Sequence, residues 1–398
     1  MHALRRNLIA LILVFATVGG AVHVIAEWSR DQPTAVLPAG TVVLASPSPA
    51  ITPITPRDST TLQDDIGAVL VVSQSGTEIS PMLRVLVTKG RVGGVLLFAP
   101  NFRTAAGLSA WTKRLRALAS AACLKHPILV MVDEEGGQVN QVKASFAAPS
   151  QLAAGLTGAA NVRALEHRVA TGLRRLGVGL DLAPVADVRT NPKDLVIGDR
   201  SFGANPAAVA PLVAAAVRGL HDGGVGATLK HFPGLGGAAG DPHVAIPTDF
   251  ESAAHWTNVQ LPAFKAGIDA GADAVMTTAV YVPGLGAAHT PALFSAPVVS
   301  RLRTQLGFQG VIMTDSLSMG GIGARYSLPQ ATVLALAAGN DLVLLSNGDL
   351  NYERAAMAAV QAAVRSGRLD RTKLHESAIR VNRLRDKWGV PVPSCVQP

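Results

Sequence analysis

The sequence predicts an α/β protein built as a single (β/α)8 barrel of the TIM type, and two features carry that prediction. Eight short apolar runs occur from residue 66 onward, and Ala-rich stretches with helical spacing lie between them. The apolar runs are almost continuously hydrophobic, which is typical of parallel strands covered on both faces. About eight such repeats match a closed barrel. The alternative is an open doubly wound sheet, but no Gly-x-Gly-x-x-Gly motif follows the first run.

The predicted strands alternate with helices along most of the chain. Residues 105–124, 205–224 and 327–340 are rich in alanine and predict helices that cover the barrel. Residues 352–389 indicate closing helices at the C-terminal side. The predicted strands are residues 66–73, 93–98, 127–132, 178–185, 226–232, 273–280, 310–315 and 341–346.

Composition narrows the class of protein. The chain has 398 residues, of which 48% are hydrophobic, and this is ample for a large core. The net charge is +8, and such a basic balance suits nucleic acid, an anionic membrane or acidic wall polymers. No basic run with interleaved aromatic residues occurs, so a nucleic-acid partner is not expected. A basic surface that serves solubility is the simpler explanation.

The N-terminal segment has the features of an export signal. Arg5 and Arg6 precede an apolar run at residues 8–26, which ends in the small-residue pattern of a cleavage site. The run is also nearly as long as the about 20 residues that span a bilayer. We therefore expect residues 1–26 to be a signal peptide or a retained membrane anchor. Either makes the protein extracytoplasmic, as a secreted or membrane-anchored form.

The remaining chain divides into a linker, a domain and a tail. Residues 27–61 are rich in Pro, Ser and Thr and predict a disordered linker. The barrel is expected over residues 62–392, with a tail at 393–398. The two cysteines, Cys123 and Cys395, permit one disulfide in an exported protein. The alternative is two unrelated thiols, with the first of them buried as a small hydrophobic residue.

Titratable residues collect where the predicted strands end, which is where barrel enzymes place their catalytic groups. Asp133 follows the third strand, and Asp187 lies just beyond the fourth. Lys230 and His231 end the fifth strand, and Asp315 ends the seventh. An Asp followed by Ser can instead cap a helix, so Asp315 has a structural alternative.

The loop KHFPGLGGAAGDPH, residues 230–243, is too rich in glycine and proline for a regular helix. Asp241 and His243 share one side of an extended segment, so the carboxylate can orient the imidazole as in a catalytic triad. A flexible loop can carry this pair in and out of a site. The alternatives are a solvated His beside an Asp, or a metal site that includes His231. The spacing fits no standard metal signature.

Four motifs occur in order along residues 60–390: DEEGGQVNQ, GDRSFG, KHFPGLG followed by DPH, and GVIMTDSLSM. Together they resemble glycoside hydrolase family 3, specifically the bacterial exo-β-N-acetylglucosaminidases that act on peptidoglycan fragments. The family patterns are D-Q-E-G-G-R-V-Q-R, G-x-R-S-F-G, K-H-F-P-G-H-G followed by D-S-H, and G-V-I-x-S-D-D-L-S-M.

The resemblance implies a retaining hydrolase that removes terminal β-linked N-acetylglucosamine from wall-derived glycans. Asp315 would be the nucleophile that forms a glycosyl-enzyme intermediate, and His243, oriented by Asp241, would be the acid and then the base. No metal or other cofactor is required. A carbohydrate is the expected partner, and a monomer is the favoured state. The terminal sugar would be held through its hydroxyls by Asp133, Arg200, Lys230 and His231.

The chain departs from the family pattern around these residues. Leu235 stands where the family usually has His, and Pro242 replaces the Ser between Asp241 and His243. Two alternatives follow: glycan binding with little or no turnover, and another specificity within the family, such as that of a β-glucosidase. Phosphorolysis is a third, because a neutral imidazole as the acid/base repels an anionic acceptor less than a carboxylate would. The other departures are Gln138 and Gln141 at arginine positions, Asp181 at an asparagine position, Ser316 at an aspartate position and Ala279 at a histidine position.

Overall fold

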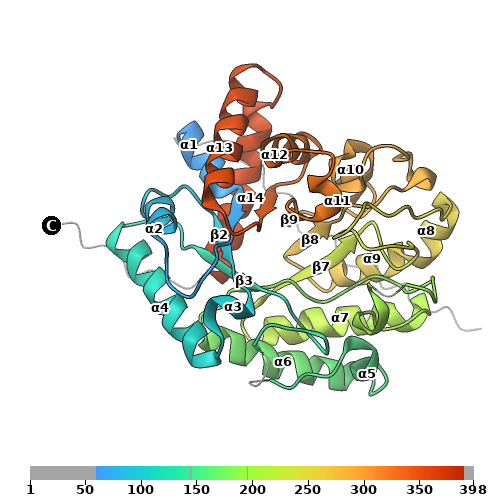
Figure 1. Ribbon diagram of the computed structural model, residues 1–398. Coiled ribbons are helices and arrows are strands. Elements are labelled where there is room, and N and C mark those ends of the chain that lie inside the picture. The colour runs from blue at the N-terminus through green and yellow to red at the C-terminus, as the bar shows by residue number, and fades with distance from the viewer. Residues whose placement is uncertain (1–59, 143–145, 195, 390–398) are drawn as a thin grey trace, which may run out of the picture. The chain divides into compact units, whose positions relative to one another are not determined.

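The computed structural model describes residues 60–142, 146–194 and 196–389. Within them eight strands close into a barrel in the order β1-β10-β9-β8-β7-β6-β3-β2, and every neighbouring pair is parallel (Figure 1). The predicted (β/α)8 barrel is confirmed. The barrel strands are β1 (Leu70–Val72), β2 (Gly94–Leu96), β3 (Leu129–Val132), β6 (Leu180–Asp181), β7 (Gly226–Phe232), β8 (Ala274–Thr277), β9 (Val311–Ser316) and β10 (Leu342–Leu345).

Each predicted strand overlaps one barrel strand, but the first prediction begins too early. Residues 66–68 end helix α1 (Leu62–Ala68) instead of starting β1. A capping box explains the difference, because the Thr61 side chain accepts from the Asp64 backbone while the Asp64 side chain accepts from that of Thr61. The hairpin of β4 (Glu134–Gly136) and β5 (Val139–Asn140) was not predicted.

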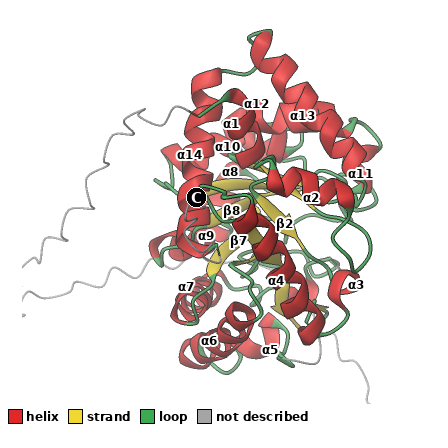
Figure 2. Cartoon of the chain, turned by 90° about the vertical axis from the view of Figure 1, so that its left-hand side faces the viewer, coloured by secondary structure: helices red, strands yellow, loops and turns green. Residues whose placement is uncertain are grey.

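Helices surround the barrel, as Figure 2 shows in red around the yellow strands. The three predicted Ala-rich helices correspond to α4 (Ala105–Ala121), α7 (Pro206–Asp222) and α12 (Leu328–Ala337). The closing segment forms α13 (Leu350–Arg365) and α14 (Arg371–Trp388). The others are α2 (Pro81–Thr88), α3 (Ala99–Phe102), α5 (Gln151–Gly155), α6 (Ala159–Arg175), α8 (Ala253–Val259), α9 (Leu261–Asp269), α10 (Ala296–Thr304) and α11 (Gly320–Gly323).

Side chains fill the inside of the barrel, so it is a packed core and not a pore. Alternate residues of the strands, such as Leu129 and Met131 of β3, point inward and form one buried cluster. Their neighbours point outward and pack against the helices. At the N-terminal end of the barrel, Trp388 lies so close to Gly226 that a Cβ there would come within 2.7 Å of the indole ring. Side-chain packing therefore closes the N-terminal end of the barrel, and the open face is at the C-terminal ends of the strands.

Several predictions for the chain termini lie outside the described residues. These are the signal peptide or anchor at 1–26, nearly all of the linker at 27–61, the tail at 393–398 and the pairing of Cys123 with Cys395. They stay predictions. No helix in the described part of the chain is long and apolar enough to cross a membrane.

Candidate active site

A cavity of about 590 Å³ opens at the C-terminal ends of the barrel strands. It gathers almost the whole predicted site, because residues from β3, β7 and β9 and from the loops after them face one space. Asp241 lies beside the cavity, next to His243. The predicted residues that line the cavity are Asp133, Arg200, Lys230, His231, His243 and Asp315.

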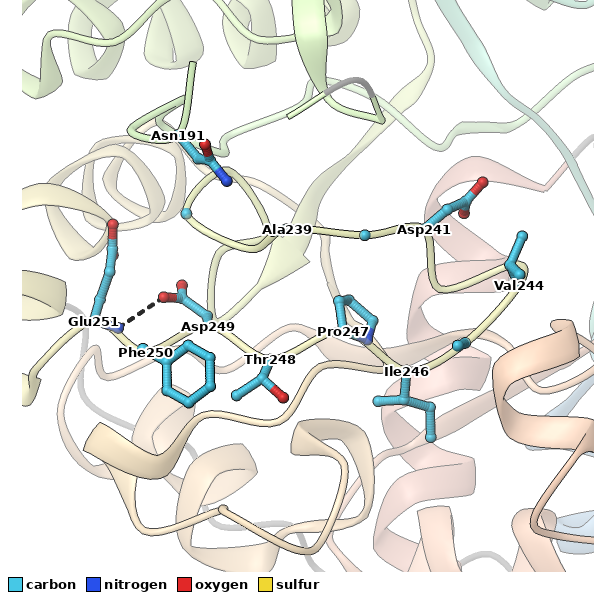
Figure 3. A pocket seen from close by; sticks show the side chains of 13 residues that line it. Asn191, Ala239, Asp241, Val244, Ile246, Pro247, Thr248, Asp249, Phe250 and Glu251 are labelled. Atoms are coloured by element: carbon cyan, nitrogen blue, oxygen red, sulfur yellow. Dashed lines mark hydrogen bonds between the residues drawn. The ribbon is translucent and has the colours of Figure 1, made fainter. Parts of the chain in front are cut away.

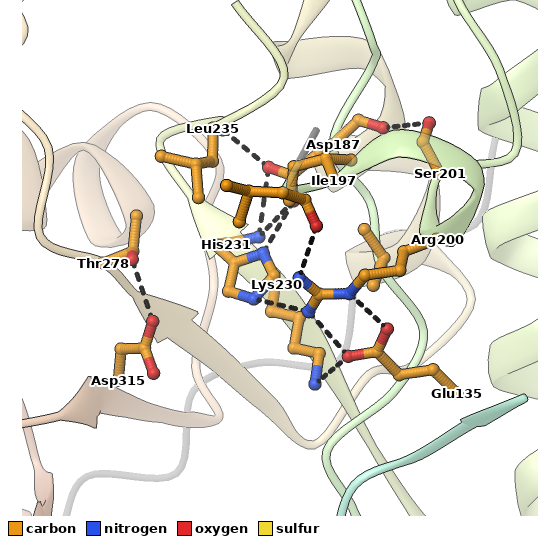
Figure 4. A network of polar contacts seen from close by, with 12 residues as sticks. Glu135, Asp187, Ile197, Arg200, Ser201, Lys230, His231, Leu235, Thr278 and Asp315 are labelled. Atoms are coloured by element: carbon orange, nitrogen blue, oxygen red, sulfur yellow. Dashed lines mark hydrogen bonds and ion pairs between the residues drawn. The ribbon is translucent and has the colours of Figure 1, made fainter. Parts of the chain in front are cut away.

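A buried ion cluster forms one wall of this cavity (Figure 4). Lys230 is only 2% exposed, and its Nζ lies 2.6 Å from both Asp133 Oδ1 and Glu135 Oε1. Arg200 donates two hydrogen bonds to Glu135, of 2.7 and 2.8 Å. Sequence reasoning assigned Glu135 no role, although it lies inside the DEEGGQVNQ motif.

The cluster keeps Lys230 and Glu135 charged. Burial by itself lowers the pKa of Lys230, but the Asp133 and Glu135 carboxylates raise it above its usual value. Burial likewise raises the pKa of Glu135, yet the Lys230 and Arg200 cations bring it down to about 2. The wall therefore offers fixed donors and acceptors to a polar ligand such as a sugar ring.

His231 is fixed by Asp187, whose carboxylate lies 2.7 Å from Nδ1 of the ring. Asp187 also accepts from the backbone N–H groups of His231 and Leu235. Arg200 Nη2 lies 3.3 Å from the other ring nitrogen, Nε2. An arginine can only donate, so this contact assigns the proton of a neutral ring to Nδ1.

Leu235 also contacts Asp187, through its backbone. Its backbone N–H donates to Asp187 at 2.7 Å, whatever the side chain is. The leucine side chain is buried and lines the cavity. A leucine at this position therefore still donates its backbone N–H to Asp187, the residue that holds His231. Its side chain makes this part of the cavity wall apolar.

Asp315 lies inside β9 and caps no helix, because α11 begins only at Gly320. Each of its oxygens accepts one hydrogen bond. Oδ1 accepts from the backbone of Ser316 at 2.8 Å, and Oδ2 accepts from the Thr278 hydroxyl at 2.9 Å. Thr278 is fully buried just beyond β8 and was not predicted. A signal existed, because MTTAV places it where the family pattern M-T-A-H-V has alanine.

His243 is oriented as predicted, with its Nδ1 2.8 Å from Asp241 Oδ1. The same carboxylate oxygen accepts from the His243 backbone. Partial burial alone raises the pKa of Asp241, but the hydrogen bonds from His243 lower it below its usual value. With Nδ1 engaged, Nε2 is the ring nitrogen left for chemistry in the cavity.

The loop that carries this pair rests on α11. Gly321 donates its backbone N–H to the carbonyl of Pro242 at 3.1 Å. A Cβ on Gly321 would lie 2.7 Å from that carbonyl oxygen, so only glycine permits this approach. The second glycine after the GVIMTDSLSM motif therefore helps to place the predicted acid/base.

Metal ligation finds no support in the described residues. No three His, Cys, Asp or Glu side chains gather there as metal ligands would. His231 and His243, two members of the alternative metal set, bind the carboxylates of Asp187 and Asp241 respectively.

Three buried carboxyl groups, those of Glu134, Asp181 and Glu166, lie behind the ion cluster. Asp181 Oδ1 accepts from the Glu134 backbone at 2.9 Å. Burial raises the pKa of Glu134 to about 7 and that of Glu166 to about 8, and it raises the pKa of Asp181 well above its usual value. A protonated Asp181 can stand in for the asparagine that is common at this position.

The chain matches the glycosyl hydrolase family 3 N terminal domain over residues 61–384. A protein named beta-hexosaminidase from Xanthomonas campestris is 35% identical over 294 residues, which cover 72% of this chain and 86% of that protein.

Two solved structures are similar in fold and sequence. One is a glycoside hydrolase family 3 beta-N-acetylglucosaminidase from Paenibacillus sp., with a TM-score of 0.80 and 34% identity. That match covers 85% of this chain and 65% of the Paenibacillus chain, which is therefore much longer. The other is LpqI of M tuberculosis, with a TM-score of 0.74 and 30% identity over 84% of this chain and 96% of that one.

The buried carboxyl cluster generates a prediction about stability and pH. The pKa of Glu166 is about 8 in the folded protein against 4.5 as the ordinary value, so the folded state binds more protons between these two values. The free energy of unfolding therefore falls as pH rises through that window. A glutamine side chain does not titrate. The free energy of unfolding of Glu166→Gln should therefore rise by a few kcal/mol relative to that of the parent between pH 5 and pH 9.

Urea unfolding at several pH values measures this difference. The control is Glu78→Gln, because Glu78 is exposed and makes only a surface ion pair with Arg114. A gap between parent and Glu166→Gln that stays constant with pH contradicts the prediction.

Proposed function

The chain belongs to glycosyl hydrolase family 3, and we propose that it is a retaining exo-β-N-acetylglucosaminidase that acts on cell-wall glycans. One observation carries the proposal. A carboxylate and a carboxylate-held imidazole, those of Asp315 and His243, line one cavity together with a fixed polar wall. A nucleophile, an acid/base and a sugar-binding surface are the parts that double displacement requires.

In the first step, a carboxylate oxygen of Asp315 attacks the anomeric carbon. The bond from that carbon to the leaving oxygen breaks, and protonated His243 gives its proton to this oxygen. In the second step, neutral His243 takes a proton from water, and the hydroxide formed attacks the anomeric carbon. The bond to Asp315 then breaks. Two inversions at the same carbon retain its configuration.

The polar wall would hold the terminal sugar during both steps. Lys230 and Arg200 offer donors, and Asp133 offers acceptors, each fixed by the ion cluster. Because these groups are already paired and positioned, little reorganisation is needed when the sugar binds. The relatives named beta-hexosaminidase and beta-N-acetylglucosaminidase support N-acetylglucosamine as this sugar.

The wall-glycan substrate and the extracytoplasmic location rest on the N-terminal sequence. A charged start followed by an apolar run is the pattern of an exported or anchored protein. An enzyme outside the cytoplasm meets the polysaccharides of the wall.

Phosphorolysis is a second candidate function. It is favoured by a histidine, rather than a carboxylic acid, as the proposed acid/base. A neutral imidazole repels an incoming phosphate less than a second carboxylate would. Asp241 places a carboxylate directly behind the ring, however, and this carboxylate keeps negative charge near the acceptor. We therefore rank hydrolysis first.

Replacing the nucleophile tests the proposed function. Residues 61–398 should release p-nitrophenol from p-nitrophenyl N-acetyl-β-glucosaminide, and Asp315→Asn should lower kcat by at least about 10³-fold because an amide is a poor nucleophile. The control is Asp349→Asn, since this residue caps α13 and asparagine caps equally well. Equal activity of Asp315→Asn would refute the nucleophile. A product that becomes a sugar 1-phosphate on addition of phosphate would replace hydrolysis by phosphorolysis.

The hydroxyl of Thr278 should position the nucleophile. Thr278→Ala removes a hydrogen bond to a carboxylate, which is worth about 1.5–3 kcal/mol, so kcat should fall by roughly 10- to 100-fold while KM changes little. Thr278→Ser keeps the donor and should restore most of the rate. An alanine variant with the kcat of the parent shows that the contact has no catalytic effect.

A further inference from the structure

A second hollow, of about 830 Å³, lies on the outer side of the loop that carries His243 (Figure 3). We call it the outer hollow. Residues 237–251 of the loop provide nearly all of its lining, and Asn191 completes it. Figure 3 shows Asp241 and Val244 at one end and Phe250 and Glu251 at the other. None of the functions assigned above uses this space.

The hollow is held open by backbone contacts. An antiparallel bridge joins Ala239 to Thr248, so the two limbs of the loop are tied together across it. Thr248 also pairs with Tyr281, whose carbonyl accepts from the Asp249 backbone at 2.8 Å. The walls are therefore formed before any ligand binds, which lowers the entropy cost of binding.

The outer hollow and the catalytic cavity share the turn that holds the acid/base. Asp241 lines the outer hollow, while the next two residues, Pro242 and His243, line the catalytic cavity. Only Oδ1 of Asp241 accepts from His243, so Oδ2 has no partner among the recorded contacts of the described residues. The His243 imidazole acts on the leaving oxygen. The turn formed by Asp241, Pro242 and His243 therefore borders both spaces, and a leaving group directed along this turn would meet the outer hollow.

The lining combines an exposed ring with oxygen acceptors. Phe250 is 84% exposed and Val244 is 75% exposed, at opposite ends of the hollow, so each offers an apolar surface to a ligand there. Asp241, Asp249 and Glu251 contribute carboxylates, of which the first and the last contact the imidazoles of His243 and His255. The residues that line the hollow, all of them described, include no lysine, arginine or histidine. A sugar ring has one apolar face for an aromatic ring and hydroxyls for the carboxylates.

We propose that the outer hollow is a leaving-group subsite for a saccharide without negative charge, with Phe250 as its stacking platform. The proposal rests on the function proposed above and narrows its substrate class. The lining supplies three carboxylates and no cationic side chain that could pair with an anionic leaving group, so neutral leaving groups are favoured. Among wall glycans, the favoured leaving saccharides are those whose carboxyl groups are absent or engaged in amide bonds.

Binding a remote sugar in this hollow has a use in catalysis. Contacts made away from the reacting carbon help to fix the scissile bond beside His243. Such contacts act on an oligosaccharide but not on an aryl glycoside, whose leaving group is a single short ring. This difference separates the subsite from the catalytic cavity.

The test compares chitotetraose, a neutral oligomer of N-acetylglucosamine, with p-nitrophenyl N-acetyl-β-glucosaminide. Phe250→Ala should lower kcat/KM for chitotetraose about tenfold more than for the aryl glycoside, which corresponds to the loss of one aromatic contact. The control is Leu156→Ala, because Leu156 is equally exposed and lines neither cavity. An equal fall with both substrates, or no fall with chitotetraose, overturns the subsite.

A charge variant tests the specificity. Asp249 is buried, and its Oδ1 accepts a hydrogen bond from the Glu251 backbone N–H, which an asparagine oxygen can also accept. Asp249→Asn should raise kcat/KM for N-acetylglucosaminyl-N-acetylmuramic acid, which carries a free carboxylate, by a few-fold relative to chitobiose. A ratio that does not change refutes the electrostatic part.

A binding measurement separates failure of the subsite from failure of the proposed function. If the parent cleaves neither substrate, the glycosidase function fails. Calorimetric titration of chitotetraose into the parent and into Phe250→Ala then decides the subsite by itself. Binding about tenfold weaker in the variant supports it, and equal or undetectable binding in both overturns it.

Discussion

A single buried ammonium group, that of Lys230, holds the active end of this barrel together. It lies near the C-terminal end of β7 and bridges two carboxylates that follow β3, those of Asp133 and Glu135. Arg200 closes the cluster from another segment by its paired hydrogen bonds to Glu135. A buried charge without its partners is strongly destabilising, so each residue of the cluster holds the others in place. This polar wall of the cavity is therefore fixed before a ligand arrives.

The two halves of the site differ in how firmly they are held. Lys230 and His231 are buried and fixed by carboxylates, whereas the imidazole of His243 is 67% exposed on a loop. This division fits their proposed tasks, because a sugar-binding wall profits from rigidity and a group that gives and takes protons profits from access to water. In the proposed subsite, the outer side of the same loop binds the leaving saccharide. Asp241 then joins the two spaces, because it orients His243 and also lines the outer hollow.

The sequence predicted the architecture well because the strands of a closed parallel barrel are apolar throughout. The first strand was extended too far, since the apolar residues 66–68 fit a buried helix end equally well and only the cap at Thr61 distinguishes the two. The predicted site residues were found from their motifs, and six of the seven line the catalytic cavity. The roles of Asp187 and Thr278 come from contacts with His231 and Asp315, which lie 44 and 37 positions away in the sequence. Such contacts depend on which strands are neighbours in the barrel. Phe250 lies in no motif at all.

The role of Asp315 as the nucleophile is the claim on which the proposed mechanism turns. The direct measurement is trapping of the intermediate with a 5-fluoro N-acetylglucosaminyl fluoride, followed by intact mass and peptide mapping. The mechanism predicts one added sugar residue per chain, on a peptide in which Asp315 carries the label. A protein that turns over the aryl glycoside while giving no adduct, or an adduct on a different residue, would contradict it.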